Sequence, residues 1–126
     1  MQRPTLFKLI SDNPELYGKL SYISGTRTVL GVYEFGRAPD NPNIPYVVWT
    51  VLGGVPYLNF DSVSQSDRLI IQIDVYAKTG SDAISIVNSI RSVIEMHCHV
   101  IDIRGIEKQT DGTFSYSFDV SWHVKL

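Results

Sequence analysis

The tripeptide His97-Cys98-His99 holds the residue types in this sequence that come closest to a metal site. Zinc needs about four nitrogen or sulfur ligands that converge on one point. On a β-strand the two histidines share one face and Cys98 points to the other, so a further ligand such as His123 would have to come from elsewhere. Cysteine pairs at zinc-site spacing are absent from the sequence. We therefore interpret the tripeptide as a helix-to-strand junction with a buried cysteine and two surface histidines, and we expect no metal.

Nucleophilic and acid–base catalysis lack a convergent set of residues. Cys98 has histidine neighbours, but adjacent strand residues point apart and no turn that could form an oxyanion hole follows. No serine lies in a Gly-x-Ser-x-Gly elbow, and the sequence has no glycine-rich phosphate loop. Asp74 and Asp119 could form a carboxylate pair from two strands, although solvated strand faces explain them more simply. We expect no enzyme, no catalytic residue and no cofactor.

The composition is that of a near-neutral globular chain. Its 126 residues are 44% hydrophobic and 19% charged, with a net charge of -2, which fits one domain over residues 1–126. The arginines are dispersed among acidic residues, so no basic patch for nucleic acids is indicated. The single cysteine excludes an internal disulfide. Neither a signal peptide nor an apolar stretch of the roughly 20 residues that span a bilayer is expected, so we predict no membrane association.

Three helices are predicted. A short one is expected over Leu6–Ile10, whose apolar residues form one side. The Asn-Pro-Glu sequence at 13–15 is typical of a second helix start, with a capping Asn, Pro in the first position and an acid near the positive end of the dipole. The strongest helix is capped by Thr79 or Ser81, and its apolar residues recur at helical spacing as far as Ile94.

Five strands complete the pattern, namely Thr28–Phe35, Tyr46–Leu52, Arg68–Ala77, Val100–Ile106 and Phe114–Val124. The second is β-branched and aromatic, which is typical of a strand buried on both faces. The last alternates large apolar with small polar residues, which predicts one buried and one solvated face. The order helix-helix-strand-strand-strand-helix-strand-strand predicts an α+β fold, with a mainly antiparallel sheet and its helices packed on one face.

Two segments rich in Pro, Asn and Ser, Gly36–Pro45 and Gly53–Asp67, are predicted to be long loops. Some apolar residues lie where the core of a monomer does not need them. Ile84 is off the apolar stripe of its helix, and the aromatic stretch 57–60 belongs to the otherwise polar second loop. A loop of this kind is often a lid over its own core. Taken together, however, these residues make self-association or a partner surface a reasonable hypothesis.

Three segments carry a resemblance to a known family. They are VYEFGRAPDNPNIPYVVWTVLGG, RLIIQIDVYAKTGSDAISIVNSIRSVI and the terminal YSFDVSWHVKL. With these segments the chain resembles the tail terminators, the small tail-completion proteins of long-tailed bacteriophages that include the lambda tail terminator. The resemblance runs from the N-terminal helix to Leu126 and consists of pattern and order, without a catalytic signature.

The resemblance implies a structural protein of the virion tail that is assembled in the host cytoplasm. Six copies would form a homohexameric ring on the head-proximal end of the tail tube. The ring would stop addition of the major tail tube protein and would present a surface to the head-tail connector or stopper protein. DNA would pass through the central hole with weak, non-specific contacts, which suits a chain without a basic patch.

A cyclic ring uses head-to-tail interfaces, so each copy needs two different complementary patches. We expect these patches at the two long loops, facing the outer sides of the strands and the helix. The predicted interface residues are Arg37, Asp40, Asn43, Tyr57, Leu58, Phe60, Asp61 and Ile84. Two other functions fit the same sequence. One is another neck component, such as a connector stopper; the other is a small-molecule binding domain, which would be a monomer with a deep apolar pocket.

Overall fold

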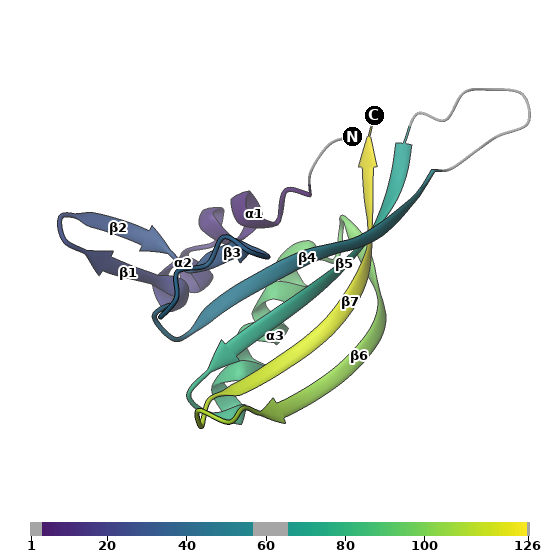
Figure 1. Cartoon of the computed structure of the whole chain (residues 1–126). Helices are drawn as coiled ribbons and strands as arrows, with labels where there is room; N and C mark the ends of the chain where they lie inside the picture. The colour runs from purple at the N-terminus through teal and green to yellow at the C-terminus, as the bar shows by residue number, and fades with distance from the viewer. Residues whose placement is uncertain (1–3, 57–65, 126) are drawn as a thin grey trace, which may run out of the picture.

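The computed structural model describes residues 4–56 and 66–125, whose arrangement is drawn in Figure 1. The helices are α1 (Leu6–Asp12), α2 (Pro14–Leu20) and α3 (Gly80–Ile94). The strands are β1 (Ser21–Ser24), β2 (Arg27–Leu30), β3 (Val32–Glu34), β4 (Tyr46–Pro56), β5 (Ser66–Ala77), β6 (Cys98–Lys108) and β7 (Phe114–Lys125).

The main sheet has five strands in the order β3-β4-β5-β7-β6, and each neighbouring pair is antiparallel except β3 with β4. A separate two-stranded sheet contains β1 and β2. Figure 1 shows α3 behind the main sheet, so that one face of β5 and β7 is covered and the other is open. The predicted α+β class, with a mainly antiparallel sheet and its helices on one face, is confirmed.

The helix starts follow from their capping residues, as predicted. The side chain of Asn13 accepts a hydrogen bond from the Leu16 amide at 3.0 Å, and Pro14 occupies the first turn of α2. The Thr79 hydroxyl accepts from the Asp82 amide at 3.1 Å and begins α3. Each side chain satisfies a backbone donor that the helix itself leaves unpaired.

The core lies between α3 and the covered face of the sheet. Its fully or almost fully buried residues include Val47 of β4, Leu69, Ile71, Ile73 and Val75 of β5, Phe118, Val120 and Trp122 of β7, Ile86, Val87, Ile90 and Ile94 of α3, and Leu6, Ile10, Leu16 and Leu20 of α1 and α2. All three helices therefore pack their apolar sides into one cluster, which holds the sheet from one side.

The predicted strand Thr28–Phe35 is wrong in extent, because the chain changes sheets at Gly31. The amide of Gly31 donates to the Leu20 carbonyl at 2.8 Å, and its own carbonyl accepts from Val47 at 2.8 Å. A Cβ added at this position would lie 3.0 Å from the Leu20 oxygen. A side chain here would crowd the Leu20 backbone, so glycine suits this close passage, and β2 ends before Gly31 while β3 begins after it. The short hairpin of β1 and β2 was not predicted.

The prediction that Tyr46–Leu52 is buried on both faces is also wrong. Within β4, Val47 and Trp49 are buried, but Val51 and Leu52 are 42% and 52% exposed. The helices cover one face only, so the other face of β4 stays open. The strand also runs on to Pro56, and β5 begins at Ser66, so both ends of the predicted loop Gly53–Asp67 are strand.

The polar face of β7 is not solvated, contrary to the prediction. Ser115, Asp119 and Ser121 are 4%, 8% and 7% exposed, although no helix lies over them. The strand order explains their burial, because β7 lies between β5 and β6 and larger neighbouring side chains flank its small polar ones.

Candidate functional site

The segment 36–45 begins with a tight turn at one edge of the main sheet. The amide of Arg37 donates to the carbonyl of Glu34 at 2.9 Å, and Gly36 has a φ of 87°. A positive φ at the third position of such a turn requires glycine or a close substitute. The Arg37 guanidinium lies 3.8 Å from the Glu34 carboxylate and is 73% exposed. An exposed ion pair of this kind contributes little to stability, so Arg37 is available for contacts with another molecule.

A groove of about 320 Å³ separates this segment from the open face of the sheet. Asp40 lines it together with Phe35, Pro39, Pro42 and Tyr76. Of the three interface residues predicted in this segment, Asp40 alone is among the groove's lining residues; Arg37 and Asn43 are exposed outside it. Phe35 was not predicted, yet it is 71% exposed beside the groove.

Four tyrosines from four strands form a row that leads to this groove. Tyr46 and Tyr76 stack with ring centroids 4.7 Å apart, Tyr33 lies 6.4 Å from Tyr46, and the hydroxyl oxygens of Tyr22 and Tyr33 are 3.0 Å apart. Burial, together with the hydrogen bond to Tyr22, raises the pKa of Tyr33 to about 12. Burial likewise raises the pKa of Tyr46 and of Tyr76. Tyr33, Tyr46 and Tyr76 are therefore neutral across the physiological pH range.

The remaining open face carries a network of polar side chains. Both carboxylate oxygens of Asp74 accept hydrogen bonds from the Gln72 amide, at 3.1 and 3.0 Å, and one also accepts from the Ser117 hydroxyl. Asp119 binds the guanidinium of Arg104 through both of its oxygens. The two carboxylates that could have formed a catalytic pair are thus bound by different partners, and each forms part of a polar network on the sheet.

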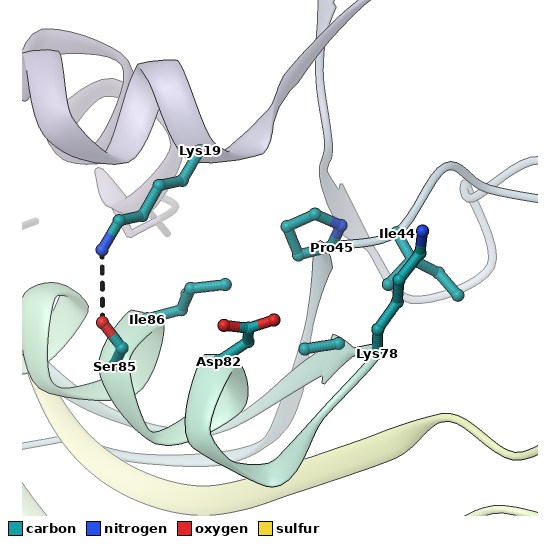
Figure 2. A pocket seen from close by; sticks show the side chains of 8 residues that line it. Lys19, Ile44, Pro45, Lys78, Asp82, Ser85 and Ile86 are labelled. Carbon is teal, nitrogen blue, oxygen red and sulfur yellow. Dashed lines mark hydrogen bonds between the residues drawn. The ribbon is translucent and has the colours of Figure 1, made fainter.

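A second hollow, of about 340 Å³, lies where α2, α3 and the end of the 36–45 segment meet. Figure 2 shows Lys19 reaching down to Ser85, with Lys78 on the opposite side and Asp82 between them. The Lys19 ammonium donates to Ser85 at 3.2 Å and pairs with Glu15 at 3.1 Å, which lowers the pKa of Glu15. Charged groups border its apolar wall, to which Ile44, Pro45 and Ile86 contribute.

The His97-Cys98-His99 tripeptide is a helix-to-strand junction, as predicted. The Cys98 thiol is buried and donates to the Ile94 carbonyl at 3.3 Å, and burial raises its pKa to about 11. His97 and His99 are exposed, and the ring of His97 stacks on Trp122 at 5.9 Å. Across residues 4–56 and 66–125, no three His, Cys, Asp or Glu side chains are placed to hold a metal ion.

Ile84 lies on the side of α3 that faces β6. Arg91, which is seven residues further along and so on nearly the same side of the helix, borders a hollow with Val100 of β6. A Cβ at Gly80, one turn before Ile84, would lie 3.4 Å from the side chain of Ile106. The other predicted interface residues, Tyr57, Leu58, Phe60 and Asp61, lie outside the described residues.

A comparison of the sequence with known protein families finds a match over most of the chain. A family model described as tail completion protein gp17 matches residues 14–125, which run from the start of α2 to the end of β7. No curated protein matches the sequence. In the part of the chain that the structure describes, no helix is long and apolar enough to cross a membrane.

Proposed function

Because this chain belongs to the tail completion protein gp17 family and is therefore a structural protein of the phage tail, we propose that it closes the head-proximal end of the tail tube. Six copies form a ring there, each contributing residues 1–126 as one domain. One face of the ring complements the last ring of the major tail tube protein. The other face does not repeat that surface, so the next tube subunit finds no matching site and the tube stops growing.

The exposed apolar surface is the observation that carries this proposal. Phe35, Leu52 and Ile101 are 71%, 52% and 51% exposed; Phe35 follows β3, whereas Leu52 belongs to β4 and Ile101 to β6. Apolar surface that a folded chain leaves in contact with water is typical of association sites. A protein that works as a ring segment buries such side chains between copies and against the tube.

The segment 36–45 supplies the polar contacts of the proposed interface. Arg37, Asp40 and Asn43 are exposed on a segment that begins with the turn at Gly36 and leads into β4 at Tyr46. Tyr57, Leu58, Phe60 and Asp61 join the same interface by their residue types. Aromatic and arginine side chains dominate the binding energy of many protein interfaces, so we assign the largest effects to Arg37 and Tyr57.

The finished ring faces the head with a surface for the connector or stopper protein and lets DNA pass through its hole. DNA affinity requires clustered cations that release counterions. Arg104 is already bound to Asp119, and the chain carries a net charge of -2. Contacts with the passing DNA are therefore weak and non-specific, as a conduit requires. Assembly takes place in the host cytoplasm, and the protein ends in the virion tail.

Growth of purified tail tubes tests the capping function directly. Tube protein that polymerises in the presence of this protein should give tubes that stop growing at one end, with six-fold rings on those ends in electron micrographs. Continued growth at both ends would overturn the proposal. Binding to connector-filled heads, with no binding to bare tubes, would instead identify a connector stopper.

Two alanine variants test the interface residues. Arg37→Ala and Tyr57→Ala should leave the far-ultraviolet circular dichroism unchanged and should reduce the yield of infectious particles in a tail-joining assay. Arg27→Ala, at an exposed arginine of the separate β1–β2 sheet, is the matched control and should be fully active. Full activity of both Arg37→Ala and Tyr57→Ala would remove these residues from the interface.

A further inference from the structure

The β6 edge of the main sheet exposes a group of isoleucines. Ile101, Ile103 and Ile106 of β6 are 51%, 48% and 42% exposed, and Ile84, which is 41% exposed, lies on the adjoining side of α3. Within the described residues, β6 pairs with β7 alone, so the backbone groups along its other side have no strand partner. A long apolar edge of this kind is a template for pairing with another chain.

The opposite edge of the same sheet, at β4, also has unpaired backbone groups and exposed apolar side chains. β3 covers only Val47–Trp49 of β4, and Phe35 adds one more hydrogen bond at Trp49. Beyond that point β4 continues to Pro56 without an outer partner among the described residues. Val51 and Leu52 are exposed there, just beyond Trp49, whose carbonyl accepts from the Phe35 amide. The sheet thus ends on both sides in a partly unpaired, apolar strand edge.

We propose that the β6 edge of one copy docks on the outer edge of β4 in the next copy, beyond β3. This inference rests on the proposed ring and names the contact that closes it. A cyclic ring needs two different surfaces that complement each other head to tail, and the two edges meet that requirement because they lie at opposite ends of one sheet. β6 offers its whole length, Cys98–Lys108, and β4 offers the part from Thr50 to Pro56 that β3 leaves uncovered.

The strand directions fix the type of pairing. β4, β5, β7 and β6 alternate in direction, so β6 runs antiparallel to β4. Rotation about a ring axis preserves each strand's direction along that axis, and the junction between copies is therefore antiparallel, like most of the sheet itself. Bulges at Val51/Gly53 and at Val100/Asp102 interrupt regular pairing on the two edges at the same level of the sheet. Leu52 and Ile101 are the extra residues at these bulges, and with 52% and 51% of their surface exposed they form the centre of the proposed contact.

Crosslinking between single cysteines tests this contact on rings assembled at tube ends. Leu52→Cys and Ile101→Cys are prepared separately and together in a Cys98→Ala background. A short bis-maleimide is used as the crosslinker, because it can join the two thiols even where the strands pair a residue away from direct opposition. A mixture of the two single variants should give crosslinked dimers, whereas each variant alone should give none. The double variant should give a ladder that ends at six copies. The control pair Ile23→Cys with Ile101→Cys, which uses an isoleucine 76% exposed on β1, should give no ladder.

The outcomes separate this inference from the proposed function. Capped tubes without crosslinks, or crosslinking of Ile101→Cys with itself, would overturn the edge contact and leave tube capping intact. Failure of the wild-type protein to cap tubes would overturn the ring itself. A charge exchange gives an independent measurement, because Leu52→Asp and Ile101→Lys should each abolish ring formation and the double variant should restore it. Loss of rings in the double variant, with the fold intact, would also contradict the contact.

Discussion

The covered and open faces of β5 and β7 exclude water by different means. On the covered face, Ile73, Val75 and Phe118 have no exposed surface, because α3 lies over them. On the open face, Asp74 and Asp119 are 9% and 8% exposed without any covering helix. Their burial depends on neighbouring side chains and on the hydrogen bonds that Gln72, Ser117 and Arg104 make to them.

The two faces of β5 and β7 therefore have different roles: the covered face stabilises the fold, and the open face sets the polar surface of the protein. Apolar packing under a helix contributes most of the folding free energy, and it tolerates no polar group without a partner. The open face stabilises the fold less, but its fixed carboxylates and tyrosines set a defined pattern of charge and shape. Under the proposed ring, this face stays constant while the edges of the sheet make the contacts between copies.

Truncation at the centre of the covered face should have the largest effect. Phe118→Ala removes a side chain with no exposed surface, and we expect the free energy of unfolding to fall by about 3–5 kcal/mol. Urea denaturation followed by circular dichroism measures the change. Ser117→Ala is the matched control on the open face and should cost about 1 kcal/mol, through the hydrogen bond lost to Asp74. Equal losses in the two variants would contradict the division between the faces.

Removing the charge of Asp119 should have a smaller effect. Asp119→Asn keeps the shape and weakens the bond to Arg104, whose side chain is 42% exposed, so solvent screening limits the loss to about 1 kcal/mol. A double-mutant cycle with Arg104→Gln in urea denaturation isolates the coupling between the two side chains. A coupling energy of zero would show that neighbouring strands alone bury Asp119.

Local signals in the sequence predicted the elements of the covered face well. Asn13 and Thr79 cap their helices where expected, and the spacing of Ile86, Val87 and Ile90 identified the buried side of α3. Such signals depend on residues close together in the chain, so pattern alone reveals them. The resemblance of the whole sequence to tail terminators identified the family, although no single motif would have done so.

The open face could not be predicted, because it depends on strand order. The tyrosine row joins Tyr22, Tyr33, Tyr46 and Tyr76 from four strands, and only the pairing of β3, β4 and β5 brings the last three together. The alternation in β7 indicated a polar face but could not show that neighbouring strands bury it. The extent of β4 was underestimated because Gly53, Gly54 and Pro56 are typical of loops.

The smallest effect that we predict is a loss of stability at alkaline pH that comes from the tyrosine row. The folded chain raises the pKa of Tyr33 to about 12 and that of Tyr46 and Tyr76 above the ordinary value of 10, mainly by burial. Between about pH 10 and 12 the unfolded chain therefore binds fewer protons than the folded chain. The free energy of unfolding falls as pH rises through this range, since its slope has the sign of that difference, and the stability from these groups is fully present below pH 10.

Tyr33→Phe isolates the contribution of this hydroxyl from all other contributions to the loss of stability at alkaline pH. The variant keeps the ring but removes the most strongly shifted hydroxyl, so its loss of stability between pH 9 and about 11.5 should be shallower than that of the wild type. Urea denaturation at each pH gives the slope, and absorbance of tyrosinate at 295 nm gives the titration itself. Tyr17→Phe, which removes the hydroxyl of an exposed tyrosine of α2 outside the row, is the matched control. Identical slopes for all three proteins would show that the hydroxyl of Tyr33 titrates as freely in the folded chain as in the unfolded one.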